Sequence, residues 1–286
     1  MIFQIEENLL PANEKTLRRY YDSVEQGDFL DILDTLADDI TYVISGDPSI
    51  LPFSGECVGK ASVTKLFQAF GDAFQLLHLS ENLVINCGDR VISCNDESFA
   101  VFKTGLFYRV PVLHIAEFNS ENKIVRFLNI HDTSTAEQAF AGRDPALVSI
   151  MPPAPAPLAN TPLTEAELAG RAKSLVGLVF EGHLPADQVE IAGLHLYVPG
   201  LSHRSFISGV WTGTLLRNEY PERAAKFCSA YNLQKGGTII DRVTLSQGKV
   251  AVEGHLNGRS DSWAITAQLN GKSIATASLF IDTATL

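Results

Sequence analysis

Two histidines stand in segments whose alternation of apolar and polar residues predicts β-strands. His114 lies in the segment 105–118, and His131 lies in the segment 123–131, where it shares a face with Asn129 because alternate side chains of a strand point the same way. Histidine titrates near neutral pH, so either imidazole is able to take up or release a proton. The two segments therefore carry candidate groups for acid–base chemistry.

Other motifs beside these histidines have simpler interpretations. Asp132 points away from the His131 face and precedes a Ser-Thr-Ala-Glu run typical of a helix cap, so we do not assign it as a base. The segment 55–62 approaches a phosphate-binding loop but is one residue short, and no strand of a parallel sheet precedes it. The four cysteines have no metal-ligand spacing. We expect neither a metal nor a cofactor.

Composition limits the classes of partner. The 286 residues are 45% hydrophobic and 19% charged, which is typical of a chain that folds into packed cores. The formal charge of −11, without a basic cluster, argues against nucleic acid. The longest clean apolar run is 175–180, far below the ~20 residues of a membrane span. The beginning of the sequence has no signal-peptide pattern, so we expect a cytoplasmic protein without membrane contact.

The elements that must position the histidines follow a helices-then-strands order. Asn13 is a candidate N-cap of the first helix, which Gly27 ends. Further helices are expected over 29–36 and 63–74, with strands over 40–44, 81–87, 90–104, 105–118 and 123–131. This order predicts an α+β domain in which a curved, mostly antiparallel sheet wraps over N-terminal helices to form a cone. The wide end of such a cone would hold a pocket for a small molecule.

The second half of the sequence repeats this layout after a proline-rich stretch. We expect a first domain at 1–145, a linker at 146–163 and a second domain at 164–286. In the second domain we expect helices at 165–181 and 215–233 and strands at 189–198, 238–246, 249–256, 262–269 and 273–282. The two halves have similar loop motifs and similar strand ends. This similarity predicts a tandem duplication of cone-shaped domains, with a diverged second copy.

Three stretches of the first domain give a family resemblance: "RRYYDSVEQGDFLDILDTLADDITYVI", "FSGECVGKASVTKLF" and "HIAEFNSENKIVRFLNIHDTSTAEQAF". Over about 130 residues this order resembles the SnoaL-like branch of the nuclear transport factor 2-like superfamily, which has a cystatin-like cone and includes ketosteroid isomerase, limonene epoxide hydrolase and polyketide cyclases. The resemblance implies the fold; the reaction differs between members.

The resemblance also implies roles at matching positions. Tyr20 falls at the oxyanion-hole tyrosine of ketosteroid isomerase-like proteins, and His114 falls at its acidic partner. Ile44 falls at the position of the general-base aspartate of ketosteroid isomerase, and an aliphatic side chain cannot accept or donate a proton. The catalytic aspartate of limonene epoxide hydrolase-like proteins is replaced by Asn129, an amide that cannot ionise. With His131 on the Asn129 face, the four catalytic candidates are Tyr20, His114, Asn129 and His131, converging on one pocket.

Aromatic residues supply the expected ligand surface, although most aromatic side chains of a domain form its core. The candidates for ligand binding are Tyr42, Phe53, Phe67 and Phe127. In the second copy the positions of Asn129 and His131 hold Leu279 and Ile281. That copy is therefore expected to be a structural partner or an apolar pocket. The two copies would form an intrachain pseudo-dimer, or the chain a homodimer.

Three functions stay open from the sequence. The first is a cofactor-free acid–base isomerase, cyclase or hydrolase acting on a small hydrophobic carbonyl, enol or epoxide compound. The second is a non-catalytic binder of an apolar metabolite or pigment, because the two known bases are replaced. The third is a structural tandem domain.

Overall fold

The computed structural model describes residues 10–86, 88–131, 133–145, 163–181, 190–191, 193–197, 211–212, 238–246, 248–256, 262–270 and 273–281. The contacts of the chain divide it into two compact units, 1–130 with 135–147 and 131–134 with 148–286. Most of the expected linker 146–163, the expected helix 215–233 and Asp132 lie outside the described residues. No helix within the described part of the chain is long and apolar enough to cross a membrane.

The first unit contains the expected helices with shifted ends. They are α1 Ala12–Gln26, α2 Phe29–Thr35, α3 Lys60–Ala73 and α4 Thr133–Phe140. Gly27 ends α1 in the left-handed region at φ 68°, a conformation that glycine adopts without a Cβ penalty. Asp28 then caps α2 by accepting from the backbone N–H of Asp31.

The predicted N-cap of α1 is wrong. The helix begins at Ala12, with Pro11 at the cap position two residues before Asn13. The Asn13 side chain instead donates to the carbonyl of Gly88 at 2.6 Å and contacts the amide of Asn86. Asn13 therefore ties the start of the helix to the distant turn between two strands, a contact that capping preference alone does not reveal.

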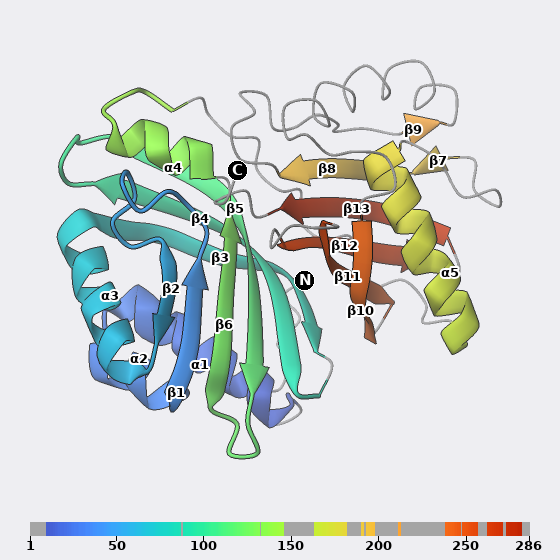
Figure 1. The fold of residues 1–286 in the computed structure, drawn as a ribbon, viewed down its shortest axis with the longest axis horizontal. Coiled ribbons are helices and arrows are strands. Elements are labelled where there is room, and N and C mark those ends of the chain that lie inside the picture. The colour runs from blue at the N-terminus through green and yellow to red at the C-terminus, as the bar shows by residue number, and fades with distance from the viewer. Residues whose placement is uncertain are drawn as a thin grey trace, which may run out of the picture. The chain divides into compact units, whose positions relative to one another are not determined.

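A six-stranded sheet follows the order β2-β1-β6-β5-β4-β3 (Figure 1). Its strands are β1 Leu36–Ile44, β2 Gly55–Val58, β3 Phe74–Asn86, β4 Arg90–Val101, β5 Phe107–Phe118 and β6 Ile124–His131. The pairs β1–β2, β3–β4 and β4–β5 are antiparallel, and β1 and β6 are parallel. The α+β class and the curved, mostly antiparallel sheet are confirmed.

The second predicted strand, which corresponds to β3, was placed too late. The sequence predicted a helix through Phe74 and a strand from 81, but α3 ends at Ala73 and β3 begins at Phe74. Phe74 is paired with Val101 of β4, and its ring packs edge-on against Phe99 of the same strand. Tertiary pairing thus overrides a local pattern that fits a helix equally well.

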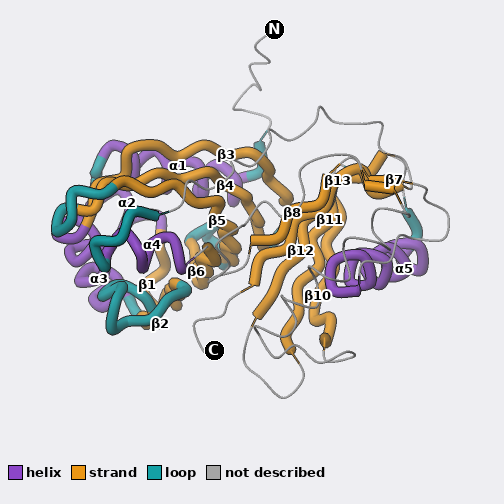
Figure 2. The backbone as a smooth tube through the Cα atoms, turned by 90° about the horizontal axis from the view of Figure 1, so that it is seen from above, coloured by secondary structure: helices purple, strands orange, loops and turns teal. Residues whose placement is uncertain are grey.

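The helices α1, α2 and α3 lie along one face of this sheet (Figures 1 and 2). The side of the sheet that they cover is called the inner face below. The core between the layers includes Leu17 of α1, Val63 of α3 and Val112 of β5, each at most 1% exposed. Burial of such aliphatic side chains stabilises the unit by about 1.5–3 kcal/mol each.

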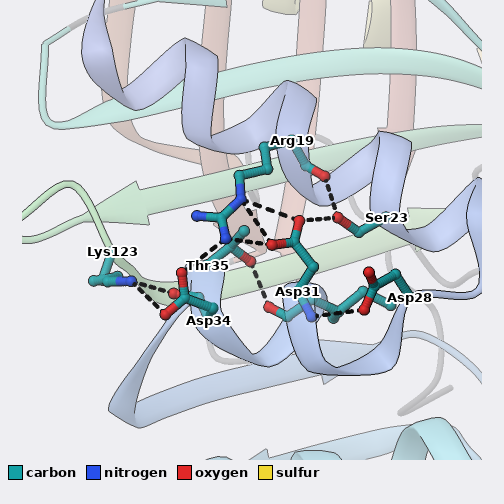
Figure 3. Close-up of polar contacts among 8 residues, drawn as sticks. Arg19, Ser23, Asp28, Asp31, Asp34, Thr35 and Lys123 are labelled. Carbon is teal, nitrogen blue, oxygen red and sulfur yellow. Dashed lines mark hydrogen bonds and ion pairs between the residues drawn. The ribbon is translucent and has the colours of Figure 1, made fainter.

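An ion-pair network at the surface joins α1, α2 and the turn before β6 (Figure 3). Arg19 contacts the carboxylates of Asp31 and Asp34, and Lys123 also contacts Asp34. Ser23 donates to Asp31. The network joins α2 to α1, the helix that carries Tyr20 and Tyr21.

The second unit has one helix and a five-stranded sheet among its described residues. The helix α5 Glu165–Val176 begins at a capping box formed by Thr164 and Glu167 and continues into a π-helical turn, Gly177–Glu181. The sheet order is β10-β11-β12-β13-β8, and a second pair joins β7 and β9. Bounds are β7 Glu190–Ile191, β8 Gly193–Tyr197, β9 Trp211–Thr212, β10 Thr238–Ser246, β11 Lys249–Leu256, β12 Ser262–Asn270 and β13 Ser273–Ile281.

The two sheets share one pattern of strand order and direction. In the second, an antiparallel run from β10 to β13 ends on the parallel strand β8, as the run from β3 to β6 ends on the parallel strand β1. Leu279, expected at the Asn129 position, is fully buried in an apolar core with Trp263 and Leu175. The duplication itself stays a prediction.

Candidate functional site

His114 lies on the inner face of the first sheet, in the middle of β5. It is only 4% exposed, pairs across the strands with Ser93 of β4 and has its ring 4.7 Å from that of Phe127 on β6. Alternation along β5 places the histidine on the same face as apolar core residues. The histidine is therefore a buried polar group on the face that packs against the helices.

Three side chains contact the two nitrogens of this imidazole. The Tyr21 hydroxyl lies 2.9 Å and the Asn95 Nδ2 atom 2.8 Å from Nδ1. The Asn129 Nδ2 atom lies 2.9 Å from Nε2. A neutral imidazole accepts at only one nitrogen, so in that state one of the two amides must turn its oxygen to the ring. Together the three contacts fix the orientation of the His114 ring.

Glu97 adds a second titratable group on the same face. Its Oε1 atom lies 3.7 Å from His114 Nε2, and the residue is 5% exposed. Burial raises the pKa of Glu97 to about 8, opposed by a hydrogen bond from Asn95, because removing a carboxylate from water disfavours its charge. Glu97 is therefore neutral at pH 7 and close to its titration point, so the pair is able to hold and exchange a proton.

Tyr20, the predicted oxyanion residue, is bonded to Tyr42. Their hydroxyl oxygens are 2.7 Å apart, and both residues are almost fully buried. Burial raises the pKa of Tyr20 and Tyr42 above the usual value, so both stay protonated and act as hydrogen-bond donors or acceptors. The neighbouring hydroxyl on α1, that of Tyr21, is the one that reaches His114.

The four aromatic candidates belong to two groups of packed rings, which the contact between Phe67 and Phe70 joins. Tyr42 stacks on Phe127 with ring centroids 4.8 Å apart, and Phe67 packs edge-on against Tyr42. Phe53 instead packs against Phe70, Phe74 and Phe140 in a second aromatic group. The first group adjoins His114, whose ring approaches Phe127. That any of the four contacts a ligand stays a prediction.

His131, at the end of β6, is 8% exposed. Burial lowers its pKa to about 4, so the imidazole is neutral at physiological pH. Residues 131–134 group with the second compact unit, whereas His114 and its contacts belong to the first.

Sequence reasoning missed Tyr21, Ser93, Asn95 and Glu97. Ser93, Asn95 and Glu97 alternate along β4, so they share a face next to the predicted strand of His114. Three polar residues at alternate positions of one predicted strand, next to the strand of His114, could have indicated these site residues from the sequence. No group of three or more His, Cys, Asp or Glu suited to a metal occurs among the residues that the structure places.

Comparison with known proteins finds a family match within the first unit. Residues 17–127 match the SnoaL-like domain family, and no curated protein matches the sequence. A nuclear transport factor 2-like protein from Burkholderia thailandensis has 19% identity and a TM-score of 0.41, over 46% of this chain and 98% of its own. One of unknown function from Burkholderia pseudomallei has 18% identity and a TM-score of 0.39, over 42% and 90%.

The family match begins within α1, before Tyr20 and Tyr21, and extends to Phe127 in β6. The observed helices and curved sheet agree with it. Residues 17–127 of this chain are therefore similar to the SnoaL-like domain family.

Proposed function

We propose that the first domain catalyses cofactor-free proton transfer on a small hydrophobic carbonyl compound, as an isomerase or cyclase does. The observation that carries the proposal is the Glu97–His114 pair, buried on the inner face with a separation of 3.7 Å. Buried titratable groups with a specific partner are typical of active sites.

In the proposed reaction, neutral His114 removes a proton from a carbon next to the carbonyl. The C–H bond breaks, the proton moves to the ring nitrogen that is unprotonated in the neutral imidazole, and the electron pair moves onto the carbonyl oxygen to give an enolate. Tyr20 or Asn129 would donate a hydrogen bond to that oxygen. Return of the proton to another atom completes an isomerisation and restores the neutral imidazole.

The neighbours of His114 would serve to position it. Contacts from Tyr21 and Asn95 at Nδ1 and from Asn129 at Nε2 hold the ring in one orientation. Glu97, neutral at pH 7, would supply or store the proton beside the ring. His131, with a pKa of about 4, would contribute as a neutral group.

The test is exchange of carbon-bound hydrogen for deuterium in 2-tetralone and benzoylacetone, followed by proton NMR in deuterated buffer. We expect the wild type to accelerate exchange and His114→Gln to lose about a hundredfold, since general acid–base catalysis contributes at least this factor. His78→Gln is the matched control, because His78 is an exposed histidine on β3. Equal rates for the wild type and His114→Gln would refute the role of His114.

A binder without catalysis would give a different result. If neither ketone exchanges faster with the wild type than without it, native mass spectrometry of protein purified from its own cell tests for a retained apolar ligand. A retained ligand together with absent exchange would favour the binding function.

A further inference from the structure

The hydroxyl of Tyr21 bridges two other buried polar groups. Its oxygen lies 2.5 Å from Ser93 Oγ and 2.9 Å from His114 Nδ1, and all three residues are buried. Ser93 is the residue of β4 directly opposite His114 on β5. The Tyr21 ring also stacks on the imidazole, with ring centroids 5.6 Å apart. The three side chains therefore form one connected hydrogen-bonded chain on the inner face.

The single hydrogen of the Tyr21 hydroxyl serves only one of these two neighbours at a time. Burial raises the pKa of Tyr21 well above its usual value, so this hydrogen stays on the oxygen at neutral pH. When Nδ1 of His114 is unprotonated, the hydroxyl is able to donate to it. When Nδ1 carries a proton, the nitrogen is itself a donor and the hydroxyl oxygen must accept.

Proton uptake by His114 therefore decides where the Tyr21 hydrogen points. Both nitrogens of an imidazolium are donors, so Nδ1 then donates to the Tyr21 oxygen. The Tyr21 hydrogen needs a different acceptor in that state, and Ser93 Oγ is the other hydrogen-bond partner of this hydroxyl. Without Ser93, a buried hydroxyl hydrogen would lose its acceptor as the ring becomes charged, which would disfavour the charged ring.

The titratable groups on the elements around His114 leave a role for such neutral dipoles. Glu97 lies 3.7 Å from Nε2, but burial raises its pKa to about 8, so at pH 7 it supplies no negative charge. On β3, the Glu81 carboxylate pairs with Arg18 of α1. Tyr20 and Tyr42 stay protonated. An imidazolium formed at pH 7 therefore depends on oriented hydroxyl and amide dipoles for its stabilisation.

We propose that Ser93 is a positioning residue that acts through Tyr21: it accepts the Tyr21 hydrogen when His114 is protonated and thereby stabilises the imidazolium. In the proposed reaction the imidazolium forms as the C–H bond of the substrate breaks, so its stabilisation would raise the rate. This catalytic consequence rests on the proposed function. The titration of His114 is measured without any substrate.

Titration of His114 in the full chain tests the proposal. Nitrogen-15 NMR of labelled histidine, assigned by His114→Gln, follows the ring between pH 5 and pH 9. We expect Ser93→Ala to lower the midpoint by about one pH unit, the effect of one hydrogen bond that stabilises a charged group. Ser93→Thr keeps the hydroxyl and should keep the wild-type midpoint. Ser98→Ala, two strand positions from Asp96 on the opposite face of β4, is the matched control and should leave the midpoint unchanged.

A double-variant comparison tests whether Ser93 acts through Tyr21. Tyr21→Phe removes the bridging hydroxyl without changing β4 and should lower the midpoint at least as far as Ser93→Ala does. Adding Ser93→Ala to Tyr21→Phe should give no further shift. If Ser93→Ala does not fold, Ser93→Cys replaces it, because cysteine fills a similar space and its sulfur is a weaker acceptor.

Three results would overturn the proposal. An unchanged midpoint in Ser93→Ala would favour the Asn95 amide, turned with its oxygen toward Nδ1, as the acceptor for the imidazolium. The same further shift with and without the Tyr21 hydroxyl would show that Ser93 does not act through it. A wild-type ring that stays neutral down to pH 5 would show that the chain does not stabilise the charged state.

The exchange assay with 2-tetralone separates this proposal from the proposed function. We expect Ser93→Ala to lower kcat about threefold to tenfold and to leave KM within about twofold, since Ser93 contacts Tyr21 and acts on the charged ring. Wild-type exchange combined with an unchanged midpoint in Ser93→Ala would reject the role of Ser93 alone. A lowered midpoint in Ser93→Ala, with no acceleration of exchange by the wild type, would reject the proposed function and support the hydrogen-bonded chain.

Discussion

The carboxyl oxygen Oε1 of Glu97 lies 3.7 Å from Nε2 of His114, and both residues are at most 5% exposed. The two side chains come from neighbouring strands, β4 and β5, and meet because alternation places both on the inner face. A buried carboxyl beside a buried imidazole lowers the stability of the folded state if either group carries an uncompensated charge. The pair is therefore expected to influence both stability and proton transfer.

Replacing Glu97 should make stability less dependent on pH. The folded pKa of about 8 is above the value of 4.5 for the exposed group, so the native state binds the proton more tightly than the unfolded state. Wild-type stability contributed by this group is therefore lost as pH rises from about 4.5 to 8. We expect Glu97→Gln to gain roughly 3 kcal/mol over the wild type in urea unfolding between pH 5 and pH 8. The same difference for Glu56→Gln should be near zero, and a pH-independent gain for Glu97→Gln would contradict the raised pKa.

The hydroxyls of Tyr20 and Tyr42 should be energetically coupled. Each hydroxyl is the hydrogen-bond partner of the other at 2.7 Å in a buried setting, so removing one leaves the other unsatisfied. We expect Tyr20→Phe and Tyr42→Phe each to lower the free energy of unfolding by about 1–3 kcal/mol. The double variant should lose less than the sum of the two, as urea unfolding will show. Strict additivity would mean that the two hydroxyls do not depend on each other.

Acid should destabilise the chain through His131. Burial lowers its folded pKa to about 4 from 6.5, so the unfolded state binds the proton more tightly. Stability from this group is present above pH 6.5 and is lost as the pH falls towards 4. We expect His131→Gln to lose less stability than the wild type between pH 7 and pH 4.5, by roughly 2 kcal/mol. The exposed His78→Gln serves for comparison, and parallel pH curves for His131→Gln and the wild type would rule out this titration.

The network of Arg19 with Asp31 and Asp34 should contribute little at high salt (Figure 3). Nearly half of the Arg19 side chain is exposed, and exposed ion pairs contribute about 0–1 kcal/mol. We expect Arg19→Gln to lower the free energy of unfolding by less than about 1 kcal/mol and the loss to shrink in 1 M sodium chloride. A larger loss that salt leaves unchanged would show that packing of the Arg19 stem dominates.

Sequence patterns predicted the larger elements because their periodicity is strong. The alternation in β4, β5 and β6 is clear, so the strand that carries His114 is found within a few residues. Phe74 was misplaced because the segment around it fits a helix and a strand equally well, and only pairing with Val101 decides. The contact between Tyr21 and His114 joins residues 93 apart in sequence, and no local rule selects Tyr21 over Tyr20.

The protonation state of Glu97 tests the central claim most directly, namely that the inner face holds a mobile proton near neutral pH. Carbon-13 NMR of the full chain with labelled glutamate carboxyls, assigned by Glu97→Gln, follows this group between pH 5 and pH 10. We expect the neutral-acid signal at pH 7 and a midpoint near pH 8. A carboxyl already ionised at pH 6 would contradict the account.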